Sequence, residues 1–360
     1  MHSRDSAGRK HHEPPHPYRG PFQRDRDRIL HCSAFRRLAG KMQVFTGDMG
    51  DYHRTRLTHT FEVASIARTI ARVLRLNEDL VEALALMHDI GHPPYGHCGE
   101  DVLHDCMRQV GGFSHNQFAL TIVEDLEQRF NRFSGLNLSA EVLAGQTVRA
   151  NKHQAQQGWS PLLEVQVVDA ADSIAYDAHD IDDALQMGLL TVEEFAKVPL
   201  VASALSAIES RLGHLPPKQL RPALVHELVD MQVSKFLQHN IPRFQAIDGK
   251  TAAEVREAGM RVEEDAQFAL QRRELERFLF ANIYRHERLL KIRQSAGQRL
   301  EALHSHLVRE PDRLPLRFRQ RMQIVGPIRA VGEYLAGMTD RFCDAQHEYL
   351  FHGAGPLADW

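Results

Sequence analysis

The 360-residue sequence is short of the features that would cross-link it or anchor it in a membrane. Its four cysteines include no Cys-x-x-Cys pair, which argues against a zinc knuckle and against a disulfide framework. No segment approaches the roughly 18 consecutive apolar residues of a membrane span, and the Met-His-Ser-Arg start has no apolar signal core. We therefore expect a cytoplasmic protein without membrane contact. A formal net charge of −3 provides no global attraction to nucleic acid.

Strand-like alternation is also scarce, whereas helical periodicity runs through nearly every segment from Asp25 onward, so the sequence predicts an all-α fold. Asn77 is expected to N-cap a helix that ends at His88. Ser114 is expected to begin a capping-box helix that continues through Phe130.

Further helix signals follow in the second half of the chain. Pro161 is placed at the favoured first position of a helix that runs to about Gly188, and Thr191 is expected to cap the next helix. We divide the chain into a mobile tail (1–20), a helical core (21–190) and a C-terminal helical region (191–360) that packs on the core.

The most informative segment is His-Asp-Ile-Gly-His-Pro-Pro-Tyr-Gly-His, residues 88–97. Leu80, Leu84 and His88 recur every fourth residue, which places the His88 imidazole at the buried end of an apolar helix. Two other His-Asp dipeptides, at His104 and His179, lack this setting. Neutral imidazoles and a carboxylate suit Mg, Mn, Co, Ni, Fe or Zn. The segment therefore indicates a metal-dependent hydrolase.

The predicted helix after Pro161 carries a row of acids. Asp172, Tyr176 and Asp180 lie four residues apart and project from one side of it. Composition alone favours a solvated acidic face. The approach to Asp172 is nevertheless apolar at Val165, Val167, Val168, Ala170 and Ala171, which is more typical of a buried segment, in which an Asp needs a partner. His59 has a similar ambiguity, because a lone His before an apolar helix is more often structural than a ligand.

Together these residues resemble the HD-domain phosphohydrolases, in which two His and two Asp hold a divalent metal. A closer resemblance, to the deoxynucleoside triphosphate triphosphohydrolases of the dGTPase-like family, extends in order from about residue 19 to 345. It is carried by the segments Arg24–Ile29, Ala34–Leu38, Lys41–Phe45, Thr55–Thr60, Asn77–Leu80, Gly96–Glu100 and Tyr334–Arg341.

The resemblance implies that a dNTP is cut between its 5′ oxygen and the α-phosphorus, giving a deoxynucleoside and inorganic triphosphate. It also implies a catalytic pair, and two histidines that contact phosphate oxygens. The implied metal ligands are His59, His88, Asp89 and Asp172, the implied pair is His97 with Glu100, and the phosphate-contacting histidines are His92 and His115.

For the substrate, the resemblance implies an Arg56 contact to the α-phosphate, with the bidentate geometry that suits arginine. Gln43 and Asp180 resemble the pair that bonds the 3′-hydroxyl. Tyr176 resembles the ring that excludes a 2′-hydroxyl, and Tyr284 a tyrosine near the phosphate tail. The sequence departs from the family pattern at Met42, Tyr95 and Ser173, which leaves the contacts to the β and γ phosphates open.

The resemblance further implies a homo-oligomer and leaves open a second dNTP as an allosteric activator. The basic residues 313–321 could be an exposed face or a contact for single-stranded DNA, and the Arg24–Arg28 run a salt-bridged stretch or a phosphate clamp. Two alternative functions remain: an HD phosphohydrolase that acts on another nucleotide, such as a 5′-nucleotidase, and a non-catalytic nucleotide sensor or nucleic-acid-binding protein.

Overall fold

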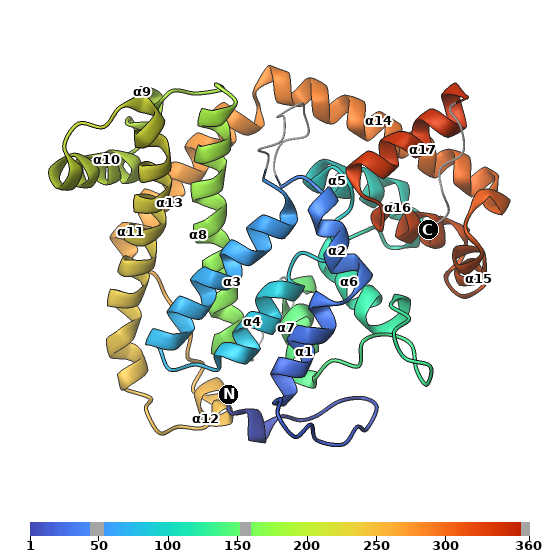
Figure 1. Cartoon of the computed structure of the whole chain (residues 1–360), viewed down its shortest axis with the longest axis horizontal. Helices are drawn as coiled ribbons and strands as arrows, with labels where there is room; N and C mark the ends of the chain where they lie inside the picture. Colours follow the sequence, from blue (N-terminus) through green and yellow to red (C-terminus); the bar gives the residue numbers. More distant parts are fainter. Residues whose placement is uncertain (44–53, 152–159, 354–360) are drawn as a thin grey trace. The chain divides into compact units, whose positions relative to one another are not determined.

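A computed structural model describes residues 1–43, 54–151 and 160–353 of the chain. Within these ranges the protein is helical and its β-structure consists of isolated bridges, so the predicted all-α fold is confirmed (Figure 1). Val44 and Phe45, which belong to one of the segments quoted above, lie outside the described residues. No described helix is long and apolar enough to span a membrane.

The described helices are α1 (Pro21–Leu30), α2 (Ser33–Arg37), α3 (Arg56–Val73), α4 (Glu78–Met87), α5 (Gly96–Cys106), α6 (His115–Thr121), α7 (Ala140–Ala150), α8 (Leu163–Gln186), α9 (Val192–Phe195), α10 (Pro199–Leu212), α11 (Pro217–Gln245), α12 (Ala252–Glu257), α13 (Ala266–Leu279), α14 (Glu287–Arg309), α15 (Leu316–Val325), α16 (Pro327–Ala336) and α17 (Asp340–His352).

The chain forms two compact units, and each unit is built from three separate stretches of sequence. The expected boundaries at residues 20 and 190 coincide with neither unit, and the packing of residues 191–360 on the core stays a prediction. Unit 1 comprises Met1–Ser6, Phe61–Ala85 and His153–Leu290, and unit 2 comprises Ala7–Thr60, Leu86–Lys152 and Lys291–Trp360.

In unit 1, α8 packs against α11 and α13, and α10 packs against the same two helices (Figure 1). The α8 side chains Val167, Ala171, Ala178 and Ile181 are fully buried, and their spacing places them on one face of the helix. Full burial of one such Val or Ile stabilises the fold by about 1.5–3 kcal/mol. The helix begins at Leu163 and not at Pro161 as expected.

Burial on α8 also includes acids. Asp177 faces Arg272 at 3.5 Å, and this guanidinium is shared with Glu264 and Glu276. Burial raises the pKa of Asp177 to about 8, because one shared arginine compensates only part of the desolvation cost. Asp180 is buried as well, so the interpretation of this flank as a solvated acidic face is wrong for these positions.

In unit 2, α5 packs against α16, α16 against α15, and α6 against α7. The N-terminal residues of this unit make specific contacts where we expected a mobile tail. Arg9 forms an ion pair with Asp25 and donates to the carbonyl oxygens of Pro21 and Asn137, each at 2.7 Å. These contacts fix the segment around Arg9 because Asp25 is fully buried and needs a cationic partner.

Two of the expected helix caps are confirmed. The Asn77 side-chain oxygen accepts from the Leu80 N–H at 3.1 Å, and Thr191 forms a reciprocal capping box with Glu194. The third expectation was wrong, because Ser114 makes no side-chain cap. Glu100 from α5 instead accepts the N–H of His115 at 2.9 Å, so a tertiary contact replaces the local cap.

The same helix also ends earlier than expected. It changes after Thr121 into a π-helical turn over Ile122–Leu126, and Glu127 is already extended. The predicted continuation of this helix through Phe130 is therefore wrong.

Candidate functional site

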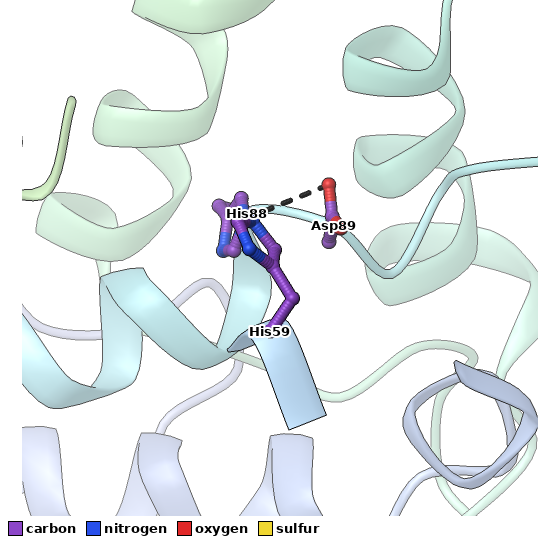
Figure 2. Close-up of side chains that lie close together, drawn as sticks. All are labelled: His59, His88 and Asp89. Carbon is purple, nitrogen blue, oxygen red and sulfur yellow. Dashed lines mark ion pairs between the residues drawn. The ribbon is translucent and has the colours of Figure 1, made fainter. Parts of the chain in front are cut away.

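Three chemically active side chains of unit 2 form one buried group. His59 lies in the first turns of α3, while His88 and Asp89 directly follow α4. All three are at most 4% exposed, and their potential ligand atoms lie within 4.8 Å of one another. The His59 and His88 rings meet edge to face, with centroids 5.5 Å apart. Figure 2 shows the ion pair between His88 and Asp89, whose Nε2 and Oδ1 atoms lie 3.5 Å apart.

The charge state of this group suits a divalent cation. Burial by itself raises the pKa of Asp89, but Arg56, His92 and His88 outweigh that effect and hold it well below its ordinary value. The carboxylate is therefore anionic at neutral pH. Two imidazoles and one carboxylate are a donor set for divalent transition metals, so these residues could hold such an ion.

Glycine at position 91 brings this group against α6. A Cβ atom added to Gly91 would lie 2.0 Å from the His115 carbonyl oxygen and 2.6 Å from the Ala119 nitrogen. Only a residue without a side chain allows the turn between His88 and His92 to approach the helix so closely. The glycine in the motif is therefore a packing requirement of the site.

A second cluster, His92, Glu100 and His115, lies next to the first. His115 Nδ1 is 2.8 and 2.9 Å from the two Glu100 oxygens. The His92 and His115 rings stack at 3.8 Å between centroids, and His92 Nε2 lies 3.1 Å from Asp89 Oδ1. His92 thus connects the two clusters through one imidazole.

The protonation states within the second cluster differ from one residue to the next. Burial, together with the positive charge of Arg56 and the proximity of His115, holds the pKa of His92 well below its ordinary value, although Asp89 opposes this. For Glu100, burial raises the pKa, but the contacts from His115 and His97 outweigh it and leave it lowered. A neutral imidazole therefore stands beside an ionised carboxylate.

His97 is the most accessible member of the group, with 54% of its side chain exposed. Its Nδ1 lies 3.5 Å from Glu100 Oε2, so Glu100 holds His115 more closely than it holds His97. The structure brings together the four residues expected to carry catalysis, His92, His97, Glu100 and His115. The assignment of their individual roles stays a prediction.

Two of the expected substrate contacts also belong to unit 2. Arg56 Nη1 donates to Asp89 Oδ2 at 2.9 Å and Nη2 to the Gln43 carbonyl at 3.3 Å. The Gln43 side-chain oxygen is buried and has no hydrogen-bond partner among the residues that the structure describes. Such an acceptor gains a bond from a hydroxyl donor.

The remaining expected site residues lie in unit 1. Asp172, Tyr176 and Asp180 share α8, as predicted. Tyr284, at the end of a π-helical turn, donates to the Asp180 carboxylate and contacts the Tyr176 hydroxyl. The structure therefore groups Tyr284 with Tyr176 and Asp180, and the role of Asp172 as fourth metal ligand stays a prediction.

The other two His-Asp dipeptides have partners that explain them without a metal. The His104 ring Nδ1 lies 3.0 Å from the Phe113 carbonyl. His179 pairs with Glu62. The apolar helix before His88, and not the dipeptide itself, was the useful signal.

The basic segments are largely neutralised. Arg24 and Arg28 both bind Glu13, which confirms the salt-bridge interpretation of that run. Arg321 binds Glu333 at 2.8 Å, whereas Arg317 and Arg319 are exposed. A DNA contact at residues 313–321 stays a prediction.

Sequence reasoning assigned no role to two ionisable residues beside the site, the buried Lys41 and the partly buried Asp340. Lys41 is 2% exposed and donates to the carbonyls of His92 and Ala336 at 2.5 and 2.9 Å. Asp340 accepts from the N–H groups of Met42 and Tyr95. Lys41 and Asp340 both lie in segments that carry the family resemblance, and that was the available signal.

Comparison with known proteins agrees with this geometry. The HD domain family matches residues 56–177, and the phosphohydrolase-associated domain matches residues 262–349. The helical fold, the histidine and aspartate group and these matches define an HD-domain phosphohydrolase.

The chain is also similar along nearly its whole length to curated bacterial proteins named deoxyguanosinetriphosphate triphosphohydrolase-like protein. The one from Ralstonia nicotianae is 40% identical over 97% of this chain and 93% of its own length. Those from Bordetella pertussis and Geobacter sulfurreducens are also 40% identical, over 96% of this chain and 94% and 92% of their own lengths. The chain therefore belongs to the deoxyguanosinetriphosphate triphosphohydrolase-like family.

Proposed function

We propose that this protein is a metal-dependent dNTP triphosphohydrolase. The oxygen of a water molecule bonds to the α-phosphorus, and the bond from that phosphorus to the 5′ oxygen breaks. The 5′ oxygen keeps the bonding electrons and takes up a proton, so the products are a deoxynucleoside and inorganic triphosphate. The names of the relatives, which refer to deoxyguanosine triphosphate, support this substrate class.

The observation that carries the proposal is the contact between the two clusters. His59, His88 and Asp89 would hold the cation together with Asp172, which is proposed as the fourth ligand. A divalent cation bound there would supply Lewis acidity toward the α-phosphate and lower the pKa of bound water. The donor set admits Mg, Mn, Co, Ni, Fe or Zn.

The protein's own residues supply the proton chemistry. Glu100 binds the Nδ1 side of His115 at 2.8 Å, which orients that ring toward the phosphate. His97 presents its Nδ1 side to Glu100 at 3.5 Å, which leaves its Nε2 for a proton exchanged with water or with the departing 5′ oxygen. The buried Nδ1 of His92 has no hydrogen-bond partner in the described part of the chain, and it is proposed to contact a phosphate oxygen. Because that oxygen accepts, while Nε2 already faces the Asp89 carboxylate, the contact requires an imidazolium, which a bound polyanion favours.

Selection of the sugar is assigned to Gln43, Tyr176, Asp180 and Tyr284. A 3′-hydroxyl can donate its one proton to the Asp180 carboxylate while its oxygen accepts from the Gln43 amide N–H, or donate to the buried Gln43 oxygen instead. The aromatic pair of Tyr176 and Tyr284, whose ring planes are within 6° of parallel, would pack against the sugar. Arg56 is proposed to contact the α-phosphate as well as Asp89, since a guanidinium has five N–H donors. Ribonucleotides are therefore expected to be poor substrates.

Product analysis tests the proposal. Purified protein is incubated with each dNTP, with mixtures and with GTP, in Mg, Mn or Co, and triphosphate is resolved from pyrophosphate and phosphate. We expect triphosphate and deoxynucleoside from dNTPs but not from GTP. In water enriched in oxygen-18 the label should enter triphosphate, because the attack is at phosphorus.

Two variants provide the comparison. His88→Ala should lose turnover, while His214→Ala, which removes an exposed imidazole of unit 1, should keep it. Release of pyrophosphate or phosphate would favour another HD phosphohydrolase, such as a 5′-nucleotidase. If no substrate is turned over in any mixture, the protein is a nucleotide sensor or a nucleic-acid-binding protein and the proposal is wrong.

Assembly and regulation are further parts of the proposal. We expect a homo-oligomer, which light scattering would detect as a mass that is a multiple of the chain's 41.0 kDa. A second dNTP acting as an activator would convert sigmoidal rates to hyperbolic ones. Hyperbolic kinetics in every mixture would argue against the activator.

A further inference from the structure

The turn between His92 and His97 contains a residue in an unfavourable backbone conformation. Tyr95 has φ +62° and Gly96 has φ +58°, so two consecutive residues are left-handed. Glycine adopts this region freely, whereas a tyrosine does so only where its surroundings impose it. Because α5, which carries His97 and Glu100, begins directly after Tyr95, this turn sets the direction of the helix.

One carboxylate binds the backbone of this turn. Asp340, the first residue of α17, accepts from the Tyr95 N–H at 2.9 Å with Oδ1 and from the Met42 N–H at 2.9 Å with Oδ2. The N-terminus of α17 itself is capped by Thr339, which accepts from the Phe342 N–H. The Asp340 side chain is therefore not the local cap of its own helix, and it joins two segments that are distant in sequence.

The Tyr95 side chain is held from the same helix. Its hydroxyl donates to Asp344 Oδ1 at 2.6 Å. Arg299 pairs with Asp344 at 2.9 Å, and its guanidinium lies 5.7 Å from the centroid of the Tyr95 ring. Tyr95 is thus fixed at its backbone and at its phenol, which together can maintain a conformation that costs free energy.

Lys41 makes a parallel connection on the other side of the turn. Its ammonium nitrogen donates to the carbonyl of His92 and to that of Ala336 at the end of α16. The Lys41 carbonyl accepts the N–H of Arg56 at 2.9 Å. Residues 41–43 therefore contact both the histidine turn and the start of α3, which carries Arg56 and His59.

We propose that Lys41 and Asp340 are positioning residues. Lys41 connects the His92 carbonyl to the end of α16, and Asp340 connects the Tyr95 and Met42 N–H groups to the start of α17. Together they hold the His92–Gly96 turn and residues 41–43 in the geometry that the reaction requires. Neither residue needs to touch substrate. The carboxylate suits this task because two oxygens accept two N–H groups, and the two donors belong to the two segments that must stay together. The catalytic consequence rests on the proposed function, but the structural one does not.

The test compares Asp340→Asn with Arg341→Ala, which removes an exposed neighbour on the same helix. An asparagine has one acceptor oxygen, so one of the two N–H groups must face an amide NH₂ and lose its bond. We expect backbone hydrogen exchange in residues 92–100 and at Met42 to accelerate at least about tenfold in Asp340→Asn, while α8 keeps wild-type protection. Arg341→Ala should leave all three regions unchanged.

Kinetics supply the second measurement. A misplacement of about 1 Å can reduce a rate about 100-fold, so kcat of Asp340→Asn should fall by about that factor, with KM changed less than kcat. Lys41→Met keeps the length of the side chain without its N–H donors. It should also lower kcat strongly and change KM less than kcat. Tyr95→Phe, which removes the hydroxyl that donates to Asp344 and leaves the backbone bond to Asp340 in place, should fall between wild type and Asp340→Asn.

The outcomes are distinguishable. If wild-type protein does not hydrolyse dNTPs, the proposed function fails, while the exchange measurement still decides the role of Asp340. Wild-type exchange at residues 92–100 in Asp340→Asn overturns the positioning role. Acceleration spread equally over α8 also overturns it, because that result indicates general destabilisation.

Discussion

Replacement of Gly91 by alanine should damage both stability and activity. The added Cβ would lie 2.0 Å from the His115 carbonyl oxygen, 2.6 Å from the Ala119 nitrogen and 3.1 Å from its Cα. All three are backbone atoms of α6, so no side-chain rotation relieves the overlap. Since real Cβ contacts essentially never fall below 3.0 Å, the turn and the helix must separate by roughly 1 Å.

The magnitude follows from this rigidity. Insertion of a methyl group into a well-packed core typically costs about 1–3 kcal/mol, and a clash with backbone belongs at the upper end. We expect Gly91→Ala to lower the free energy of unfolding by about 3 kcal/mol or more. The same separation moves His92 away from His115, so kcat should fall about 100-fold.

Urea unfolding followed by circular dichroism, together with the product assay, measures both effects. Gly297→Ala in α14 is the matched control, because its new Cβ would meet side-chain atoms and no backbone, Val102 Cγ2 at 3.2 Å and Cys98 Sγ at 3.7 Å. In a helix, alanine is favoured over glycine by about 1 kcal/mol, so the control should be neutral or slightly stabilised. A Gly91→Ala protein with the wild-type urea midpoint and full kcat would refute the reasoning.

Three further predictions concern the metal, the carboxylate of the second cluster and pH. A chelator should abolish dNTP hydrolysis and lower the Tm of the wild-type protein, because a ligand bound only by the folded state stabilises that state. The Tm of His88→Ala should stay unchanged. Equal Tm changes in the two proteins would contradict metal binding at His88. Glu100→Gln should lower kcat roughly 100- to 10,000-fold with little change in KM, because it weakens the orientation of His115; a raised KM with unchanged kcat would assign Glu100 to binding. Because the pKa of Asp177 is raised from 3.8 to about 8, the folded protein retains a proton that the unfolded chain releases. Its contribution to the free energy of unfolding therefore falls as pH rises from about 4 to about 8, by roughly 1.4 kcal/mol per pH unit. Urea midpoints of Asp177→Asn should show a shallower pH slope than wild type, and equal slopes would exclude Asp177 as the source.

The sequence predicted what depends on local periodicity and on motif chemistry. The helical fold and the cap at Asn77 followed from neighbours within a few residues, whereas the grouping of His59 with His88 and Asp89 followed from the family resemblance. The predicted Ser114 cap failed for a physical reason: Glu100 is brought close by tertiary packing and binds the helix N-terminus more effectively.

Burial decided the remaining differences, and burial is a property of the packed chain. Composition favours a solvated face for the acids on α8, yet the Asp180 carboxylate accepts a hydrogen bond from Tyr284, which lies 104 residues away in the sequence. Lys41 and Asp340 could not be assigned roles from spacing, because their partners lie 51 to 298 residues away. Such contacts have no signature in a single sequence beyond the presence of the residues.

The discontinuous arrangement of unit 2 makes the histidine turn depend on a segment that is synthesised much later. All the histidines and aspartates discussed as metal or phosphate ligands have been synthesised by residue 172, but the carboxylate that binds the Tyr95 N–H follows Tyr95 by 245 residues. A nascent chain on the ribosome therefore cannot complete this turn until α17 has emerged. A product shortened before α17 by a premature stop codon or a protease would keep every one of these ligands and the Lys41 contact to His92, and would still lack the Asp340 and Asp344 contacts to Tyr95.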